Sequence, residues 1–177
     1  MTIGTLEPRK NIVAVLRAYA RVREAGVDLP PLVLAGKPGW CGDRIRATVE
    51  SVVERGFARF LDYVPLELMP ALYSAAETFL FLPRYEGFGM PAREALLCGT
   101  PVIASDIPAL REATRGLARL VSPDEADIER LFRDYAAAGP PPRRRWPEHL
   151  DEPPDAAVQR FAAVLDSVAS RSRAVAV

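Results

Sequence analysis

The hydrophobic pattern of this chain switches repeatedly between two periods. Short apolar runs bounded by Gly or Pro are typical of strands buried in a parallel sheet, and such runs occupy residues 2–3, 31–36, 57–64, 78–83, 100–105 and 117–122. The segments between them repeat their apolar residues at helical spacing, which predicts helices within residues 11–26, 43–56, 65–76, 90–99, 108–113 and 124–139. This alternation predicts an α/β fold, a Rossmann-like doubly wound parallel sheet.

The pattern also divides the chain into segments. We expect a domain over residues 1–139, whose first strand is cut short because only Thr2 and Ile3 precede a glycine turn. The Pro- and Arg-rich stretch 140–154 breaks all periodicity and predicts a solvated linker. Residues 155–177 predict a C-terminal helix, because apolar side chains recur on one helical face.

Composition narrows the functional classes. The 177 residues, 49% hydrophobic, are enough to bury one core, and 23 basic side chains balance 23 acidic ones. A net charge of zero gives no reason to expect nucleic acid or an anionic membrane as a partner. With two cysteines and one histidine, no His/Cys metal site is expected. No run of 18 apolar residues and no secretory signal is present, so we expect a cytoplasmic protein.

Two loops carry candidate chemistry, because ligands bind parallel sheets at the carboxyl ends of the strands. The first loop, "GTLEPRKN", follows the first predicted strand, and the second, "YEGFGMP", follows the fourth. Strands one and four commonly flank the switch point of a doubly wound sheet, so we expect the loops to face one crevice. Arg9 and Lys10 stand at a helix start, where cations are disfavoured, and this favours an anionic partner.

The second loop combines glycines with two carboxylates. Gly87 and Gly89 permit backbone conformations closed to other residues, and the amides around Met90 open a helix whose dipole attracts anions. Glu86 and Glu94 flank this turn, and carboxylates accept hydrogen bonds from hydroxyl groups. A sugar phosphate suits such a loop. The alternative stays open that Glu94 only favours the helix dipole and that the glycines are ordinary loop residues.

The stretch "EGFGMPARE", from Glu86 to Glu94, resembles the E-x7-E motif of family 4 retaining glycosyltransferases, which have the GT-B fold. Further blocks are similar, in order, to the C-terminal domain of that family: "GTLEPRKN", "LVLAGKPGW", "LDYVPLELMPALYSAAETFLF", "ALLCGTPVIASDIPALRE" and "LVSPDEADIERLF". The resemblance covers about residues 1–135. It implies the donor-binding half of a two-domain enzyme.

The resemblance also implies roles for single residues. Lys10 and Glu86 are the implied catalytic residues: Lys10 contacts the donor diphosphate, helped by Arg9, and Glu86 lies near the transferred sugar. Glu94 is the implied ligand of the ribose hydroxyls. The remaining implied substrate contacts are the backbone of Gly87, Phe88, Gly89 and Met90, and the nucleobase neighbours Val64, Leu68 and Lys37.

Three departures from the family pattern stand out. Thr5 occupies a position where many members have an arginine, and we hypothesise that Arg9 supplies the missing charge. Pro83 replaces the usual serine before the E-x7-E block. The N-terminal Rossmann domain, which in the family binds the acceptor, has no counterpart in these residues.

The sequence therefore predicts the donor-binding domain of a glycosyltransferase that moves a sugar from a nucleotide sugar to a glycan or lipid-linked acceptor, with retention. "GTLEPRKN" looks like bacterial polysaccharide mannosyltransferases, so GDP-mannose is the first candidate donor and a UDP-sugar the next, with no metal or cofactor required. The expected partner is the missing N-terminal half, through which alone membrane association is expected. The alternative is a non-catalytic nucleotide-binding or scaffold module that needs a separate N-terminal half. A flavodoxin-like regulatory domain is disfavoured, since no phosphoacceptor Asp cluster follows the first strand.

Overall fold

A computed structural model describes residues 1–147 except 38, 40–41 and 145. The chain divides into two compact units, Met1–Trp146 and Pro147–Val177, and the description below concerns the first. The predicted C-terminal helix and residues 148–154 of the predicted linker lie outside the described residues. The domain boundaries drawn from the sequence therefore stay predictions.

The described strands are all parallel and short. They form two runs of three, ordered β1 (Thr2–Ile3), β2 (Leu32–Ala35), β3 (Ala58–Leu61) and β4 (Phe79–Phe81), β5 (Val102–Ser105), β6 (Arg119–Val121). Every residue of β4 and β5 is buried, whereas β3 alternates between buried and exposed. Near-continuous apolar runs thus mark central strands, and β3 lies at an edge.

Main-chain hydrogen bonds join the two runs of strands, and the Met1 amino group donates one of them to the Thr78 carbonyl at 2.7 Å. The N–H of Leu80 in β4 donates to the carbonyl of Met1, directly before β1, at 2.7 Å. The order across the sheet is therefore β3-β2-β1-β4-β5-β6, the doubly wound order of dinucleotide-binding folds. The predicted fold class is confirmed, and the loops that follow β1 and β4 flank the switch point.

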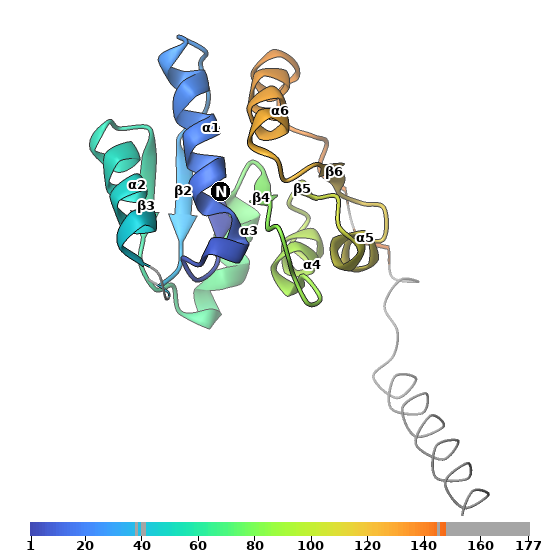
Figure 1. Cartoon of the computed structure of the whole chain (residues 1–177). Helices are drawn as coiled ribbons and strands as arrows, with labels where there is room; N and C mark the ends of the chain where they lie inside the picture. The colour runs from blue at the N-terminus through green and yellow to red at the C-terminus, as the bar shows by residue number, and fades with distance from the viewer. Residues whose placement is uncertain (38, 40–41, 145, 148–177) are drawn as a thin grey trace, which may run out of the picture. The chain divides into compact units, whose positions relative to one another are not determined.

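The helices pack in two groups. Figure 1 shows α1 (Ile12–Glu24) between α2 (Gly42–Glu54) and α6 (Glu125–Ala138), and α4 (Met90–Leu97) beside α5 (Pro108–Thr114). Helix α3 (Met69–Ala75) packs against α4. Right-handed crossovers place α1 and α2 on one face of the sheet and α3, α4 and α5 on the other. The rings of Tyr19 on α1 and Phe132 on α6 form a T-shaped pair, with centroids 5.2 Å apart.

The predicted helix over residues 65–76 is split in two. A 3₁₀ turn, η2 (Leu66–Leu68), comes first, and α3 begins only at Met69. Pro70 explains the break, because a proline has no N–H to donate and its ring clashes with the carbonyl four residues earlier. An α-helix therefore cannot run through it from Leu66.

Part of the predicted linker packs against the domain. The Arg143 side chain donates hydrogen bonds to the carbonyls of Ser74 and Ala76, at 3.1 and 2.7 Å. Trp146 is buried, and the Arg93 guanidinium of α4 lies 5.4 Å from its ring centroid. Arg143 is exposed, as expected of a solvated run, but it also ties this stretch to the end of α3. Among the described residues, no helix combines the length and apolarity that crossing a membrane requires.

Candidate nucleotide-sugar site

The two loops predicted to share a crevice contact each other directly. The first contains the 3₁₀ turn η1 (Pro8–Lys10) between β1 and α1, and the second connects β4 to α4. The N–H of Arg84 in the second loop donates to the carbonyl of Arg9 in the first, at 2.9 Å. The switch point of the sheet thus brings together residues more than 70 positions apart in the sequence.

Lys10 and Glu86 form the centre of the site. The ammonium Nζ of Lys10 lies 2.5 Å from Oε2 of Glu86, and their side chains are 10% and 14% exposed. The same ammonium lies 4.8 Å from the ring centroid of Phe81. An ion pair held among apolar groups is screened less by water than one on the surface. The structure therefore joins the two residues that the resemblance implied to be catalytic.

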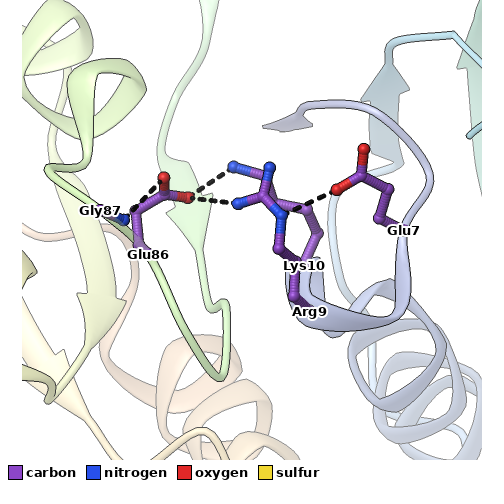
Figure 2. A network of polar contacts seen from close by, with 5 residues as sticks. All are labelled: Glu7, Arg9, Lys10, Glu86 and Gly87. Atoms are coloured by element: carbon purple, nitrogen blue, oxygen red, sulfur yellow. Dashed lines mark hydrogen bonds and ion pairs between the residues drawn. The ribbon is translucent and has the colours of Figure 1, made fainter.

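Arg9 extends this pair into a network of charges (Figure 2). Its Nε donates to Oε2 of Glu7 at 2.8 Å, while its Nη1 lies 3.4 Å from Oε2 of Glu86. The backbone N–H of Gly87 donates to the other oxygen of Glu86 at 3.2 Å. Both oxygens of Glu86 are engaged, and the two cations in the network are balanced by two carboxylates.

Opposing effects act on the pKa of Glu86. Burial raises it, while the hydrogen bond and positive charge of Lys10, the Gly87 N–H and the charge of Arg9 lower it, and the lowering effects win. Glu86 is therefore a carboxylate at neutral pH, which makes it a hydrogen-bond acceptor and not an acid. An anionic ligand that reaches Lys10 has to compete with this carboxylate for the same ammonium.

The start of α4 depends on Gly89. This residue has φ +93°, and a Cβ there would come within 2.3 Å of Cδ2 of Leu110. The N–H groups of Ala92 and Arg93 donate to the Gly89 carbonyl, at 3.0 and 3.3 Å. The N–H groups of Gly89 and Met90 come before these and have no acceptor inside the helix. N–H groups at a helix start can bind an anion.

Gly87 differs from Gly89. It does not adopt a positive φ, and a Cβ there would meet nothing within 4 Å. Gly89 therefore uses the conformational freedom that the sequence offered at both glycines, whereas Gly87 does not. Phe88 and Met90 are both exposed large apolar side chains of this loop.

Glu94 lies one helical turn into α4 and has a partner that the sequence did not identify. The phenol of Tyr73 on α3 donates to Oε2 of Glu94 at 2.9 Å. Burial, then the nearby charge of Glu94, raises the pKa of Tyr73, so the phenol stays protonated and acts as a donor. Tyr73 falls within a helical apolar pattern, in which an inward-facing aromatic is indistinguishable from an ordinary core residue.

The predicted nucleobase neighbours follow β2 and β3, at the same edge of the sheet. The Lys37 ammonium lies 4.2 Å from the ring centroid of Tyr63, Val64 is half-buried and Leu68 is exposed. Among the described residues, no hydrogen bond or ion pair joins these side chains to Lys10 or Glu86. No three His, Cys, Asp or Glu side chains of the described part of the chain group closely enough to hold a metal ion.

A doubly wound sheet with a cationic loop and a helix start at its switch point defines the class of nucleotide- and sugar-phosphate-binding domains. The sequence profile described as "Glycosyl transferases group 1" matches residues 1–138. The chain belongs to this family, and the resemblance inferred from the E-x7-E block is confirmed.

The curated relatives are bacterial sugar transferases. O-antigen chain mannosyltransferase B of Escherichia coli is 42% identical over 125 residues, which cover 71% of this chain and 33% of that protein. Serotype-specific mannosyltransferase WbdA of Escherichia coli is 34% identical over 135 residues, 75% of this chain and 17% of that protein. The chain thus spans a third or less of the length of these relatives.

Solved structures agree on the fold. Sucrose-phosphate synthase of Thermosynechococcus elongatus matches with a TM-score of 0.62 and 27% identity, over 77% of this chain and 36% of that one. Anabaena Alr3699/HepE in complex with UDP matches with a TM-score of 0.62 and 18% identity, over 77% of this chain and 38% of that one. At 18% identity, the second match supports the fold alone.

Proposed function

We propose that this chain is the donor-binding domain of a glycosyltransferase that moves a sugar from a nucleotide sugar to a glycan or lipid-linked acceptor. The observation that carries the proposal is the Lys10–Glu86 pair, with 2.5 Å between Nζ and Oε2, beside the start of α4 at the switch point. A cation and a helix N-terminus suit a diphosphate, and a carboxylate suits sugar hydroxyls. Both features lie where the fold binds ligands.

The reaction we propose breaks the bond between the anomeric carbon and the diphosphate oxygen, and the bonding electron pair leaves with the diphosphate. Lys10, Arg9 and the N–H groups that open α4 stabilise the negative charge on this leaving group. The acceptor hydroxyl oxygen forms the new bond to the anomeric carbon on the same face, and its proton passes to the departing phosphate. Retention of configuration follows from this geometry.

In this scheme Glu86 exchanges partners. The diphosphate takes over the Lys10 ammonium, so Glu86 is released to accept hydrogen bonds from the sugar. Glu94 accepts hydrogen bonds from the ribose hydroxyls. We propose that the site needs no metal, because the charges of Lys10 and Arg9 and the helix dipole supply the positive charge that a cation would provide.

We propose mannose as the sugar and GDP-mannose as the donor. Both E. coli relatives above carry the name mannosyltransferase, and one of them is 42% identical over most of the domain. A UDP-sugar is the competing donor, as the sequence led us to expect. Because Lys37, Val64 and Leu68 are proposed to contact the nucleobase, the identity of the base distinguishes the two candidate donors.

Calorimetric titration of the chain with GDP, UDP and ADP, with EDTA present, tests the proposal. We expect saturable binding of GDP, strong weakening in Glu94→Ala, and no change in Glu112→Ala, which removes an exposed carboxylate from α5. Failure of a folded chain to bind any of the three nucleotides would contradict the proposal. Binding of UDP alone would retain the transferase proposal and replace the donor.

The relatives' lengths suggest what else the reaction needs. Since the chain spans a third or less of them, we propose that an N-terminal acceptor-binding half completes the cleft, and that this chain alone turns over little sugar. Adding that half and measuring mannose transfer tests this. Recovered turnover supports the enzyme, whereas nucleotide binding without turnover supports the alternative of a non-catalytic binding module.

A further inference from the structure

Asn11 lies at the junction of the first loop, which carries Lys10, and α1. It is 6% exposed and has φ +61°, a left-handed conformation that ends η1 immediately before α1 begins. Its Nδ2 donates to the carbonyl of Pro123, in the loop before α6, at 2.8 Å. Its Oδ1 accepts a hydrogen bond from Nε of Arg84 at 3.1 Å. One buried amide thus joins three loops at the switch point.

Arg84 makes the complementary contacts from the other loop. Its backbone N–H donates to the Arg9 carbonyl at 2.9 Å, its Nε reaches Asn11, and its Nη1 lies 3.5 Å from Oδ1 of Asp124. Arg84 stands two residues before Glu86, and Asn11 directly follows Lys10. The contacts therefore connect the chain segments that carry the two members of the central ion pair.

We propose that Arg84 and Asn11 are positioning residues, which hold the Lys10 loop and the Glu86 loop at the spacing that the donor's phosphate and sugar require. The inference rests on the proposed function and names two side chains that do not touch the donor. Strand pairing does not need their contacts, because the bond between Leu80 and Met1 already joins β4 to β1. Their side chains act instead beyond the strand ends, where they add to the backbone bond between Arg84 and Arg9.

Two substitutions isolate the side chains. Asn11→Gly keeps a residue that tolerates positive φ and removes the amide, and Arg84→Leu keeps the backbone bond to Arg9 and removes the guanidinium. Arg133→Leu is the matched control, since it removes an exposed arginine that pairs with Glu129 on α6. Thermal unfolding of each variant establishes that it is folded.

The first measurement needs no ligand. Carbon-13 NMR titration gives the pKa of the Glu86 carboxyl, which is held below 4.5 chiefly by Lys10 acting against burial. We expect this pKa to rise in Asn11→Gly and Arg84→Leu, because the loops no longer hold the two charges together, and to stay unchanged in Arg133→Leu. An unchanged pKa in both folded variants overturns the proposal.

The second measurement is the affinity for GDP. We expect each single variant to bind about tenfold more weakly, the equivalent of about one lost charge-assisted hydrogen bond. The double variant should lose little more than either single one, because both act through the same contact. If the wild-type chain binds no nucleotide but the Glu86 pKa still rises in the variants, the proposed function is contradicted. The role of Asn11 and Arg84 in positioning the two loops is then still supported. If the two losses of GDP affinity are fully additive, Asn11 and Arg84 act independently, which contradicts their action through one shared contact.

Discussion

The phenol of Tyr73 donates a 2.9 Å hydrogen bond to Glu94, and this bond joins α3 to α4 beside the site. Two contacts hold Tyr73: Oγ1 of Thr100 donates to its carbonyl at 2.6 Å, and its ring forms a T-shaped pair with Phe79, with centroids 5.2 Å apart. A buried, fixed donor therefore orients one oxygen of a half-exposed carboxylate. The proposed contact of Glu94 with the ribose hydroxyls requires such a fixed carboxylate.

Tyr73→Phe tests this orientation, since it removes the hydroxyl and keeps the ring. We expect GDP to bind about tenfold more weakly, because a hydrogen bond to a charged group contributes about 1.5 kcal/mol. Titration with 2′,3′-dideoxy-GDP is the control. That ligand offers no ribose hydroxyls, so wild type and variant should bind it equally. Equal losses for both ligands would contradict the role of Tyr73.

Lys10→Met tests the charge balance at Glu86. Without the ammonium, burial is opposed only by Gly87 and Arg9, so we expect the Glu86 pKa to rise in an NMR titration. A lowered carboxyl pKa stabilises the fold above the unfolded pKa, near 4.5, and this stabilisation is lost as pH falls through the folded pKa. Urea midpoints between pH 7 and pH 3 should therefore depend less on pH in Lys10→Met than in wild type. The same pH dependence in both would show that Lys10 does not lower the pKa of Glu86.

The hydrophobic pattern sufficed to predict the sheet. Each apolar run became a strand, and the loops of β1 and β4 meet as expected, because chain connectivity and the handedness of the crossovers leave few alternatives. That topology brings together the two loops that carry Lys10 and Glu86. The predicted strand 57–64 is longer than β3 (Ala58–Leu61), since apolarity alone does not mark where an edge strand stops pairing.

The supporting side chains could not be predicted in the same way. Tyr73, Asn11 and Arg84 act through hydrogen bonds to partners that lie 21, 112 and 73 positions away in the sequence. Periodicity states which face of an element is apolar, but not which polar atom meets which. Such contacts require coordinates, and they connect the predicted site residues to one another.

Two buried hydroxyls allow a matched comparison of stability. Ser105 is fully buried, and its Oγ has no hydrogen-bond partner among the residues that the structure describes. Thr114 is equally buried, but its Oγ1 donates to the Leu110 carbonyl at 2.7 Å. Because an unpaired buried hydroxyl destabilises, we expect Ser105→Ala to raise the free energy of unfolding and Thr114→Val to lower it, each by about 1 kcal/mol. Urea unfolding measures both, and a destabilised Ser105→Ala would mean that this hydroxyl has a partner.

An added methyl group should destabilise the domain at one glycine of the second loop and leave its stability nearly unchanged at another. In Gly89→Ala the residue must keep φ +93°, and its Cβ meets Cδ2 of the buried Leu110 at 2.3 Å. Strain and overpacking together should destabilise the domain by about 2–4 kcal/mol. In Gly87→Ala the Cβ meets nothing within 4 Å and φ is not positive, so stability should change by less than about 0.5 kcal/mol. Urea unfolding of the two variants compares them directly. Equal stabilities would mean that the start of α4 rearranges freely, and then the backbone N–H groups of Gly89 and Met90 could not form a fixed anion site.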